Sequence, residues 1–242
     1  GPSGAGKSTL AACLSGAVPH HYTGTFFGSV MVDGHDTCEV SLTDVSQIVG
    51  SVLQDIDTQM VASVVEDEML FGLENFGVPH DQIEQRVSET LETVGISDLR
   101  DREIATLSGG QKQKVAIAAI LAIRPRVLVL DEPTAALDPA SSTLVFETLR
   151  EANRALGITI VIVEQKVALL SEYCNRVLVL NHGEIALQGE PHEVFAHTDE
   201  LRTIGVDCPR VTRIFNSLEA DGLASGTPCL DVDEAECLIS GI

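Results

Sequence analysis

The chain has 242 residues, and its 36 acidic against 15 basic residues give a formal net charge of −21. A chain of this length can bury a large core, and the acidic balance argues against a surface for duplex DNA or for anionic lipid. A nucleotide ligand stays compatible with this charge, because screening over about 8 Å at physiological salt lets one lysine and a helix terminus decide anion binding locally.

The apolar runs and the cysteines further limit which class of protein this chain can belong to. The longest apolar run, Val115 to Ile123, is far shorter than the roughly 20 residues of a membrane-spanning helix, and no signal peptide opens the chain. The six cysteines form no CxxC pair and no zinc spacing, which favours reduced thiols in a cytosolic protein. We therefore expect a soluble protein that can dock on a membrane partner.

The first residues, GPSGAGKST, match the phosphate-binding P-loop. In this motif the glycines let the backbone wrap around phosphates, Lys7 reaches the β and γ phosphates, and the Ser8 hydroxyl ligates Mg²⁺. No strand precedes the loop in this chain. We interpret the chain as lacking its N-terminal strands, together with the residue that would stack on the adenine.

The next segments alternate between helix and strand. Ser8 to Val18 predicts an apolar helix, which Pro19 ends. His20 and His21 follow without a third metal ligand at a suitable spacing, so we expect exposed loop histidines. Alternation from Thr25 to Asp33, followed by an Asp-Gly turn, predicts a small antiparallel element.

A helical insertion is predicted from Asp55 to Ile104, after a short helix over residues 42–47 and a strand over 48–53 that ends at Gln54. On its main helix, apolar residues recur on one face at positions 83, 87, 91 and 94, and Gly95 follows the last of them. The early acids of this insertion can be ordinary solvated surface. They are Asp55, Asp57, Glu66, Asp67 and Glu68.

The stretch from Thr106 to Pro139 concentrates the remaining motifs. Leu107-Ser108-Gly109-Gly110-Gln111 puts a hydroxyl and unhindered backbone N–H groups at the N-terminus of a helix over 110–123, where the macrodipole favours a phosphate. A strand over 127–130, apolar on both faces, then delivers Asp131 and Glu132 at its C-terminal edge, where ligands of open α/β sheets lie.

After a turn that contains Asp138, the alternation of helices and strands continues. We predict an amphipathic helix over 140–156 and a buried strand over 158–163, which ends at Glu164 and Gln165. Repeated βα units with apolar strands predict an α/β fold with a mostly parallel sheet.

The C-terminal part carries a hairpin and two helices. Strands over 175–180 and 184–188 flank Asn181-His182-Gly183, which predicts a tight turn. The tail holds one helix near 209–218. Its acids at 231–236 come just before an apolar segment, as in a first helical turn, which favours a short docked helix over a disordered acidic end.

The order of these motifs resembles the ATP-binding domain of ABC transporters: a P-loop, Gln54 at a strand end, then LSGGQ, VLVLDEP and ALDP. The resemblance spans Gly1 to about Pro191. It implies a P-loop NTPase fold of the RecA-like type, with a mostly parallel sheet, a small antiparallel β element, a helical insertion and a short C-terminal extension. We expect the ATP-binding domain over 1–204, its helical subdomain over about 55–104 and the extension over 205–242.

A narrower likeness is to the energy-coupling factor subfamily, whose members power uptake of vitamins and of cobalt or nickel. It rests on Gln54-Asp55-Ile56-Asp57-Thr58-Gln59, on Glu66-Asp67, on Phe71-Gly72-Leu73-Glu74-Asn75 and on the tail GVDCPRVTRIFNSLEADG. The resemblance implies a peripheral protein at the cytoplasmic face of a prokaryotic cell membrane. Its partners would be a second ABC ATPase domain, in a heterodimer or tandem fusion rather than a homodimer, a transmembrane scaffold and a substrate-binding membrane subunit, with no nucleic acid.

Carried onto this chain, the resemblance implies two ATP molecules, with Mg²⁺, sandwiched between two such domains. Its own nucleotide would be held by the P-loop residues Gly1, Ser3, Gly4, Ala5, Gly6, Lys7, Ser8 and Thr9. Ser8, Gln54 and Asp131 would surround Mg²⁺, and Glu132 would polarise the attacking water. Asp138 would line the seam between the domains. The ATP held by the partner would be faced by Ser108, Gly109, Gly110 and Gln111.

One position departs from the family pattern. The family places a histidine that contacts the γ-phosphate where this chain has Gln165. A glutamine still donates a neutral hydrogen bond, but it lacks the charge that strengthens the bond and it cannot shuttle a proton. We therefore expect the site built on this P-loop to hydrolyse slowly or to depend wholly on Glu132. Glu132 and Gln165 are the candidate catalytic residues.

Two functions stay open on this sequence. In the first, the chain is an ATPase subunit that powers an importer. In the second, it is a regulatory half that holds ATP while the partner's site drives the motion, which Gln165 favours. The soluble ABC proteins of translation or DNA repair fit poorly with the acidic balance. The transported substrate is not encoded here, because ATPase subunits do not touch it.

Overall fold

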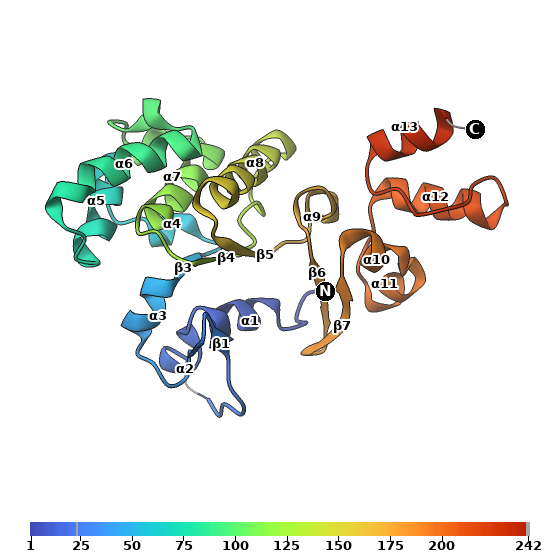
Figure 1. The fold of residues 1–242 in the computed structure, drawn as a ribbon, viewed down its shortest axis with the longest axis horizontal. Helices are drawn as coiled ribbons and strands as arrows, with labels where there is room; N and C mark the ends of the chain where they lie inside the picture. Colours follow the sequence, from blue (N-terminus) through green and yellow to red (C-terminus); the bar gives the residue numbers. More distant parts are fainter. Residues whose placement is uncertain (23, 241–242) are drawn as a thin grey trace. The chain divides into compact units, whose positions relative to one another are not determined.

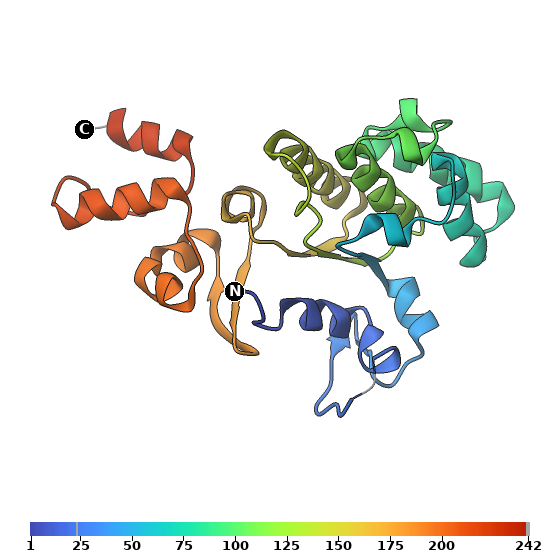
Figure 2. The same ribbon diagram turned by 180° about the vertical axis from the view of Figure 1, so that it is seen from behind.

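The computed structural model describes residues 1–22 and 24–240, and its contacts separate two compact units. Unit 2 is the continuous segment Ser8–Val163, and unit 1 combines Gly1–Lys7 with Glu164–Ile242. Figures 1 and 2 show the elements of both units from opposite sides.

A parallel sheet forms the centre of unit 2. Its strands are β3 (Val49–Val52), β4 (Val127–Asp131) and β5 (Thr159–Val163), hydrogen-bonded in the order β3-β4-β5. β4 pairs in parallel with both neighbours, so the C-terminal ends of all three strands share one edge. The predicted α/β fold with a mostly parallel sheet is confirmed.

Helices cover both faces of this sheet (Figure 1). They are α7 (Gly109–Ala122) and α8 (Pro139–Leu156) on one face, and α1 (Lys7–Leu14) and α3 (Leu42–Ile48) on the other. Successive residues of β4 point to opposite faces, so Leu128 and Leu130 enter the core with α7 and α8, while Val129 enters the core with α1 and α3. All three are at most 2% exposed, which confirms a strand that is buried on both faces.

The outer strand β5 is less buried than its sequence predicts. Thr159 is exposed and the other four residues of β5 are half-buried. Among the described residues β5 pairs only with β4 and is an edge of the sheet, which explains its exposure. The prediction of a strand over 158–163 is right in position and wrong in burial.

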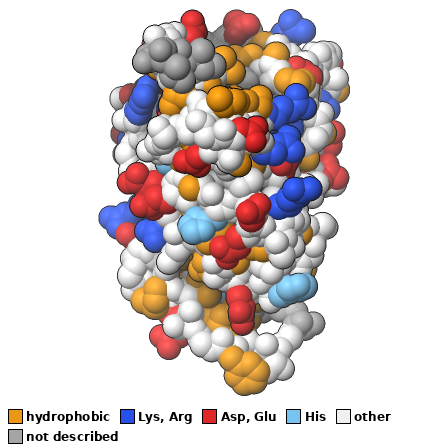
Figure 3. All heavy atoms as spheres, turned by 90° about the vertical axis from the view of Figure 1, so that its right-hand side faces the viewer, with side chains coloured by type: hydrophobic (Ala, Val, Ile, Leu, Met, Phe, Trp, Pro, Cys, Tyr) orange, Lys and Arg blue, Asp and Glu red, His pale blue; other side chains and the backbone are white. Residues whose placement is uncertain are grey.

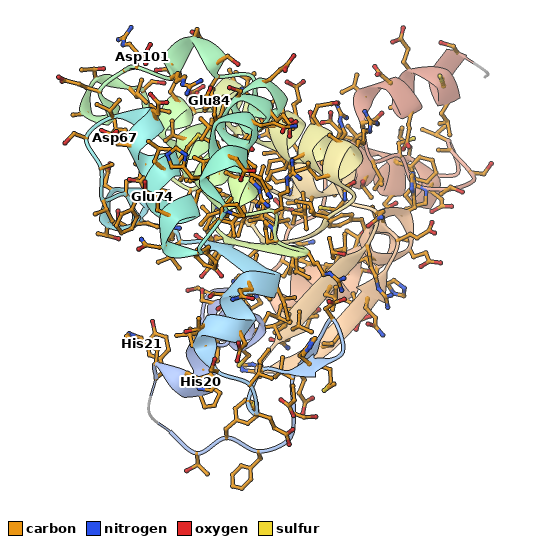
Figure 4. The ribbon with its side chains drawn as sticks, turned by 60° about the vertical axis from the view of Figure 1, so that its left-hand side comes forward. His20, His21, Asp67, Glu74, Glu84 and Asp101 are labelled. Atoms are coloured by element: carbon orange, nitrogen blue, oxygen red, sulfur yellow. The ribbon has the colours of Figure 1, made fainter. Side chains whose placement is uncertain are left out.

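The helix predicted from Ser8 to Val18 is shorter in the structure. α1 ends at Leu14, because Gly16 adopts a left-handed conformation with φ +74. A short helix, α2 (Ala17–His20), follows. His20 and His21 are exposed, as predicted, but His20 is the last residue of α2 and not part of a loop. Figure 4 shows both histidines at the end of unit 2 that carries α2.

The strand predicted from Thr25 to Asp33 is mostly wrong. Only β1 (Met31–Val32) is regular, and it pairs antiparallel with β2 (His35–Asp36). Gly28, with φ +92, interrupts the extended run before β1. The Asp33-Gly34 turn is confirmed, since both residues adopt positive φ, as the tight hairpin turn requires.

The helical insertion of unit 2 is confirmed. It contains α4 (Ile56–Gln59), α5 (Val65–Asn75), α6 (His80–Val94) and the 3₁₀ turns η1 (Ser97–Leu99) and η2 (Ile104–Thr106). The four predicted apolar residues of α6 are at most 6% exposed, and Gly95 ends the helix with φ +69. Arg100 bridges Glu66 on α5 and Glu84 on α6, and its hydrogen bonds lower the pKa of Glu84 to about 2.

Unit 1 holds a hairpin and five helices among its described residues. They are β6 (Val177–Asn181), β7 (Glu184–Gly189), α9 (Val167–Tyr173), α10 (Pro191–Ala196), α11 (Thr198–Ile204), α12 (Arg210–Ala220) and α13 (Val232–Ser240). β6 and β7 pair antiparallel around His182 and Gly183, both with positive φ, which confirms the hairpin. α12 and α13 confirm the two helices predicted in the tail.

The last helix, α13, is docked on the rest of unit 1. Nε2 of His192 on α10 lies 3.0 Å from Oε1 of Glu234, and the other oxygen of Glu234 accepts the Leu230 N–H at 2.7 Å. Figure 3 looks onto the C-terminal helices and shows apolar side chains among charged ones at the upper end of this face. Ile214 and Val232 of these helices are 62% and 69% exposed.

Three further features bear on function. No helix within residues 1–22 and 24–240 is long and apolar enough to cross a membrane. Within these ranges no three His, Cys, Asp or Glu side chains are grouped in a way that could hold a metal ion. The thiols of all six cysteines are free.

Candidate active site

The P-loop residues of unit 1 curl around the ammonium group of Lys7. Its Nζ donates hydrogen bonds to the carbonyl oxygens of Gly1 and Pro2, at 3.0 and 2.9 Å. Gly4 and Gly6 have φ of +76 and +101, conformations that residues with a side chain rarely adopt. The path of the loop therefore requires glycine at these two positions.

The β6–β7 hairpin supports this loop within unit 1. The Gly183 N–H donates to the carbonyl of Ala5 at 3.0 Å, and Ala5 is only 2% exposed. A Cβ atom on Gly1 would lie 1.9 Å from the carbonyl oxygen of Leu180 in β6. Gly1 is thus required for close backbone approach, while Ser3 stays on the exposed surface.

Ser8 and Thr9 belong to unit 2, in the first turn of α1, and both are exposed. Backbone N–H groups at such a helix start have no partner within the helix and favour phosphate oxygens. In the P-loop motif, the residues at these positions are the ones whose hydroxyls face the phosphates and the metal ion.

The C-terminal edge of β4 carries two adjacent acids. Asp131 ends the strand, and its Oδ1 is buried with no hydrogen-bond partner among the described residues. An unpaired buried acceptor costs roughly 1–3 kcal/mol, and a carboxylate oxygen of this kind fits Mg²⁺ or a water bound to it. Glu132 has φ +49, and its N–H donates to the Val163 carbonyl at 2.8 Å. This bond fixes the point from which the Glu132 side chain leaves the sheet.

Gln54 lies two residues beyond β3, at the same edge of the sheet as these acids, and it is exposed. The side chain of Gln59 braces its loop. Gln59 Oε1 accepts the Leu53 N–H at 3.0 Å, and Gln59 Nε2 donates to the Ser51 carbonyl at 2.9 Å. The loop is thereby closed onto the end of β3, which holds Gln54 at the strand edge.

The glycine-rich turn before α7 is a capped helix start. Ser108 Oγ accepts the Gln111 N–H at 3.3 Å, and Gln111 Oε1 accepts the Ser108 N–H at 2.9 Å, which together form a capping box. Ser108 and Gly109 are exposed. A Cβ atom on Gly110 would lie 3.1 Å from that of Ser141, so glycine lets this turn approach the start of α8 closely.

Asp138 caps α8 beside this turn. It accepts the Ser141 hydroxyl at 2.5 Å and the Ser141 N–H at 3.1 Å, and these hydrogen bonds lower the pKa of Asp138 below its usual range. Asp138 is therefore ionised at neutral pH. A pocket of unit 2 borders this region and is lined by Ser108, Gly110, Gln111, Lys114 and Ser141.

Gln165 follows a buried acid in unit 1. Glu164 is 8% exposed, and its Oε1 accepts the N–H groups of Gln165 and Lys166 at 2.8 and 3.2 Å. Gln165 itself is exposed. The carboxylate of Glu164 thus fixes the backbone on which Gln165 is carried.

The candidate residues fall into groups within each unit. Unit 2 brings Gln54, Asp131 and Glu132 to one edge of its sheet, and it brings the turn 108–111 next to Asp138. Unit 1 holds the P-loop up to Lys7, and Gln165.

The motifs that make up these two groups of residues match one protein family. The model of the family described as ABC transporter matches residues 1–135, which is more than half of the chain and includes the P-loop, Gln54, the turn 108–111 and both acids of β4. The chain belongs to the ABC transporter family.

Its relatives narrow the type of ABC protein. An energy-coupling factor transporter ATP-binding protein, EcfA1 of Clostridium perfringens, is 39% identical over 97% of this chain and 82% of its own length. A putative ABC transporter ATP-binding protein of Pyrococcus horikoshii is 42% identical over 92% of this chain and 78% of its own length. A solved structure of cbiO1 from Clostridium perfringens, described as part of the ABC transporter complex cbiONQ, is 35% identical with a TM-score of 0.75, over 90% of this chain and 85% of that one. The chain is an ABC ATPase of the energy-coupling factor type.

Two residues support the motifs of this ABC ATPase in a way that the sequence did not predict. Ser141 follows Asp138 at the spacing of a helix N-cap and its third helical residue, a signal that could have found it. Gln59 had no such signal, because a side chain that reaches back to the backbone of Ser51 and Leu53 leaves no recognisable spacing.

Proposed function

We propose that this ABC ATPase powers an energy-coupling factor importer of vitamins or transition-metal ions. The observation that carries the proposal is the similarity to the Clostridium perfringens EcfA1 over 97% of the chain, because it continues through the C-terminal helices beyond the family match. The protein works at the cytoplasmic face of a prokaryotic membrane. Its partners are a second ABC ATPase domain, in a heterodimer or tandem fusion, a transmembrane scaffold and a substrate-binding membrane subunit.

The P-loop side of the site binds this chain's own ATP. Lys7 reaches the β and γ phosphates, and the loop backbone with Thr9 surrounds them. Mg²⁺, when bound, neutralises charge on the phosphates. Ser8, Gln54 and Asp131 would hold it, and the buried unpaired oxygen of Asp131 supports this role.

Glu132 is the base in the proposed reaction. Its carboxylate accepts a proton from the water that attacks the γ-phosphate, and a positioned base of this kind typically contributes about 10²–10⁴-fold. The backbone bond from Glu132 to Val163 keeps the side chain at the edge of the sheet. Gln165 donates a hydrogen bond to the γ-phosphate.

The turn 108–111 serves the ATP that the partner domain holds. Ser108 and Gly109 are exposed at a helix N-terminus, where N–H groups and the macrodipole favour phosphate oxygens. Asp138 lines the seam between the two domains, and its ionised carboxylate is kept in place by Ser141.

A scaffold helix that ends in arginine is proposed to dock beside the loop after Gln54. Asp57 on α4 is 68% exposed. The segment that follows it also carries exposed apolar side chains, among them Val61 at 68% and Phe71 at 49%. Figure 4 shows further acids, Asp67 and Glu74, along α5. We expect Asp57→Lys to weaken copurification of the scaffold with the ATPase pair several-fold, because it puts a like charge opposite the arginine.

The control for this variant is Lys112→Gln. Lys112 donates to Asp57 at 2.7 Å, so this change breaks the same ion pair but leaves the acid in place. Scaffold recovery should stay close to that of the unaltered protein. If scaffold recovery falls equally in both variants, or does not fall in Asp57→Lys, the acids have no role in docking and are ordinary solvated surface.

The second candidate function is a regulatory half whose ATP is held and not turned over, which Gln165 favours. We expect Gln165→His to raise the ATPase rate of the assembled transporter by about five-fold, since a hydrogen bond from a charged donor is roughly twice as strong as a neutral one. Gln165→Asn, which keeps the amide but shortens it, should not raise the rate. An unchanged rate in Gln165→His would contradict the idea of a weakened site.

Placing Glu132→Gln in one ATPase domain at a time separates the two functions. If the change in this chain alone removes a substantial share of hydrolysis, the chain is a working ATPase. If only the matching change in the partner removes it, this chain is the regulatory half.

A further inference from the structure

The short helix α4 is tied at both ends to different parts of unit 2. At one end the Gln59 side chain bonds back to the backbone of Ser51 and Leu53, which ties α4 to the end of β3, next to Gln54. At the other, Asp57 forms an ion pair with Lys112 on α7, with Nζ and Oδ1 2.7 Å apart. α4 also packs against α7 (Figure 1). The side chains of Ile56 and Met60 pack against the larger core cluster of unit 2.

Lys112 stands one helical turn inside α7, directly behind the glycine-rich turn. Its N–H donates to the Ser108 carbonyl at 2.9 Å, and Ser108 is the residue that caps the helix. The ion pair with Asp57 therefore ends one turn from the residues 108–111. All the contacts in this chain, from the Gln54 loop to Ser108, lie within unit 2.

We propose that the Asp57–Lys112 pair couples the two nucleotide sites that this chain helps to build. This inference rests on the proposed function, in which Gln54 serves the chain's own ATP and the turn 108–111 serves the partner's. A displacement of the Gln54 loop on binding Mg²⁺ and ATP pulls α4, and the ion pair passes that displacement to the start of α7. Asp57 and Lys112 are positioning residues and touch no nucleotide.

The solvent exposure of the Asp57–Lys112 ion pair fits a role in coupling the two nucleotide sites better than a role in stabilising the fold. Lys112 is 22% exposed and Asp57 is 68% exposed, so water and salt partly screen their attraction. Pairs of this kind add little to stability. A contact of this strength can break and reform as the loop moves, and removing it should leave the fold intact.

The test measures ATP hydrolysis by the assembled transporter against ATP concentration. Lys112→Gln is expected to lower kcat by about two- to five-fold and to flatten the cooperative dependence on ATP, because the effect of an exposed ion pair lies in this range. The apparent KM at low ATP should change little, since neither residue contacts nucleotide. Lys112→Arg, which keeps the positive charge and leaves Asp57 in place, should retain both the rate and the cooperativity.

The matched control is Arg124→Gln. Arg124, just after α7, pairs with Glu89 on α6 at the same distance of 2.7 Å, but this pair lies at the other end of α7 from Ser108. Removing it should change neither rate nor cooperativity. The coupling is refuted if Lys112→Gln behaves like Arg124→Gln, or if Lys112→Arg loses cooperativity as Lys112→Gln does. Absence of hydrolysis in the unaltered complex would instead refute the proposed function.

Discussion

Replacing Glu132 with glutamine is expected to lower ATP turnover by about 10²–10⁴-fold, the usual contribution of a positioned base, while ATP stays bound. The amide has the size of the carboxylate and keeps the backbone bond to Val163, so the site retains its shape. It cannot accept the proton of the attacking water. Phosphate release and ATP retained on the washed complex, measured with both ATPase domains altered, check the two halves of this expectation.

The control for this variant is Glu151→Gln. Glu151 carries the same charge on α8, is exposed, and pairs only with Arg154 one turn away among its described contacts. Its turnover should match that of the unaltered protein. A turnover in Glu132→Gln within about three-fold of the unaltered rate would show that the base lies elsewhere, since a positioned base contributes far more.

Truncating Leu149 to alanine is expected to lower the free energy of unfolding by about 2–5 kcal/mol. Leu149 lies on α8, is 3% exposed and packs into the larger core of unit 2, where the lost side chain leaves a cavity. Such a loss is a large share of the roughly 5–15 kcal/mol that stabilises a typical domain. Urea titration followed by circular dichroism measures it.

Leu144→Ala supplies the comparison, because it removes the same atoms from the same helix. Leu144 is 49% exposed, so its loss should change the unfolding free energy by about 0.5 kcal/mol or less. Equal effects of the two truncations would mean that α8 does not pack against the sheet as described.

Elements with a strong period were predictable from the sequence. α6 shows why: its apolar residues recur at helical spacing, its end is a glycine, and both signals agree with the observed burial. The short β1 shows the opposite case. Alternation before it suggested a longer strand, but Gly28 takes a left-handed conformation that alternation cannot reveal. The exposure of β5 depends on which strands lie beside it, and that is a property of the whole sheet.

The motifs of the site were also predictable, because each has a fixed order of residue types. The residues that hold these motifs in place were harder to predict. The pairing of Asp57 with Lys112 joins residues 55 positions apart in the chain, and nothing in either local sequence points to the other. Likewise, the burial of Glu164 and its bonds to the next two N–H groups follow from tertiary packing and not from a motif.

The carbonyl oxygens of Gly1 and Pro2 accept hydrogen bonds from the ammonium group of Lys7. They therefore compete with any bound phosphate for that ammonium group. In the proposed site, ATP would gain the ammonium group only by displacing the carbonyls of Gly1 and Pro2 from it, so the affinity would reflect a difference between two sets of acceptors. A neutral ligand has little to offer in that exchange, whereas a polyphosphate brings several charged oxygens at once. The proposed loop would therefore favour polyphosphates over neutral ligands, even though the protein as a whole carries a net charge of −21.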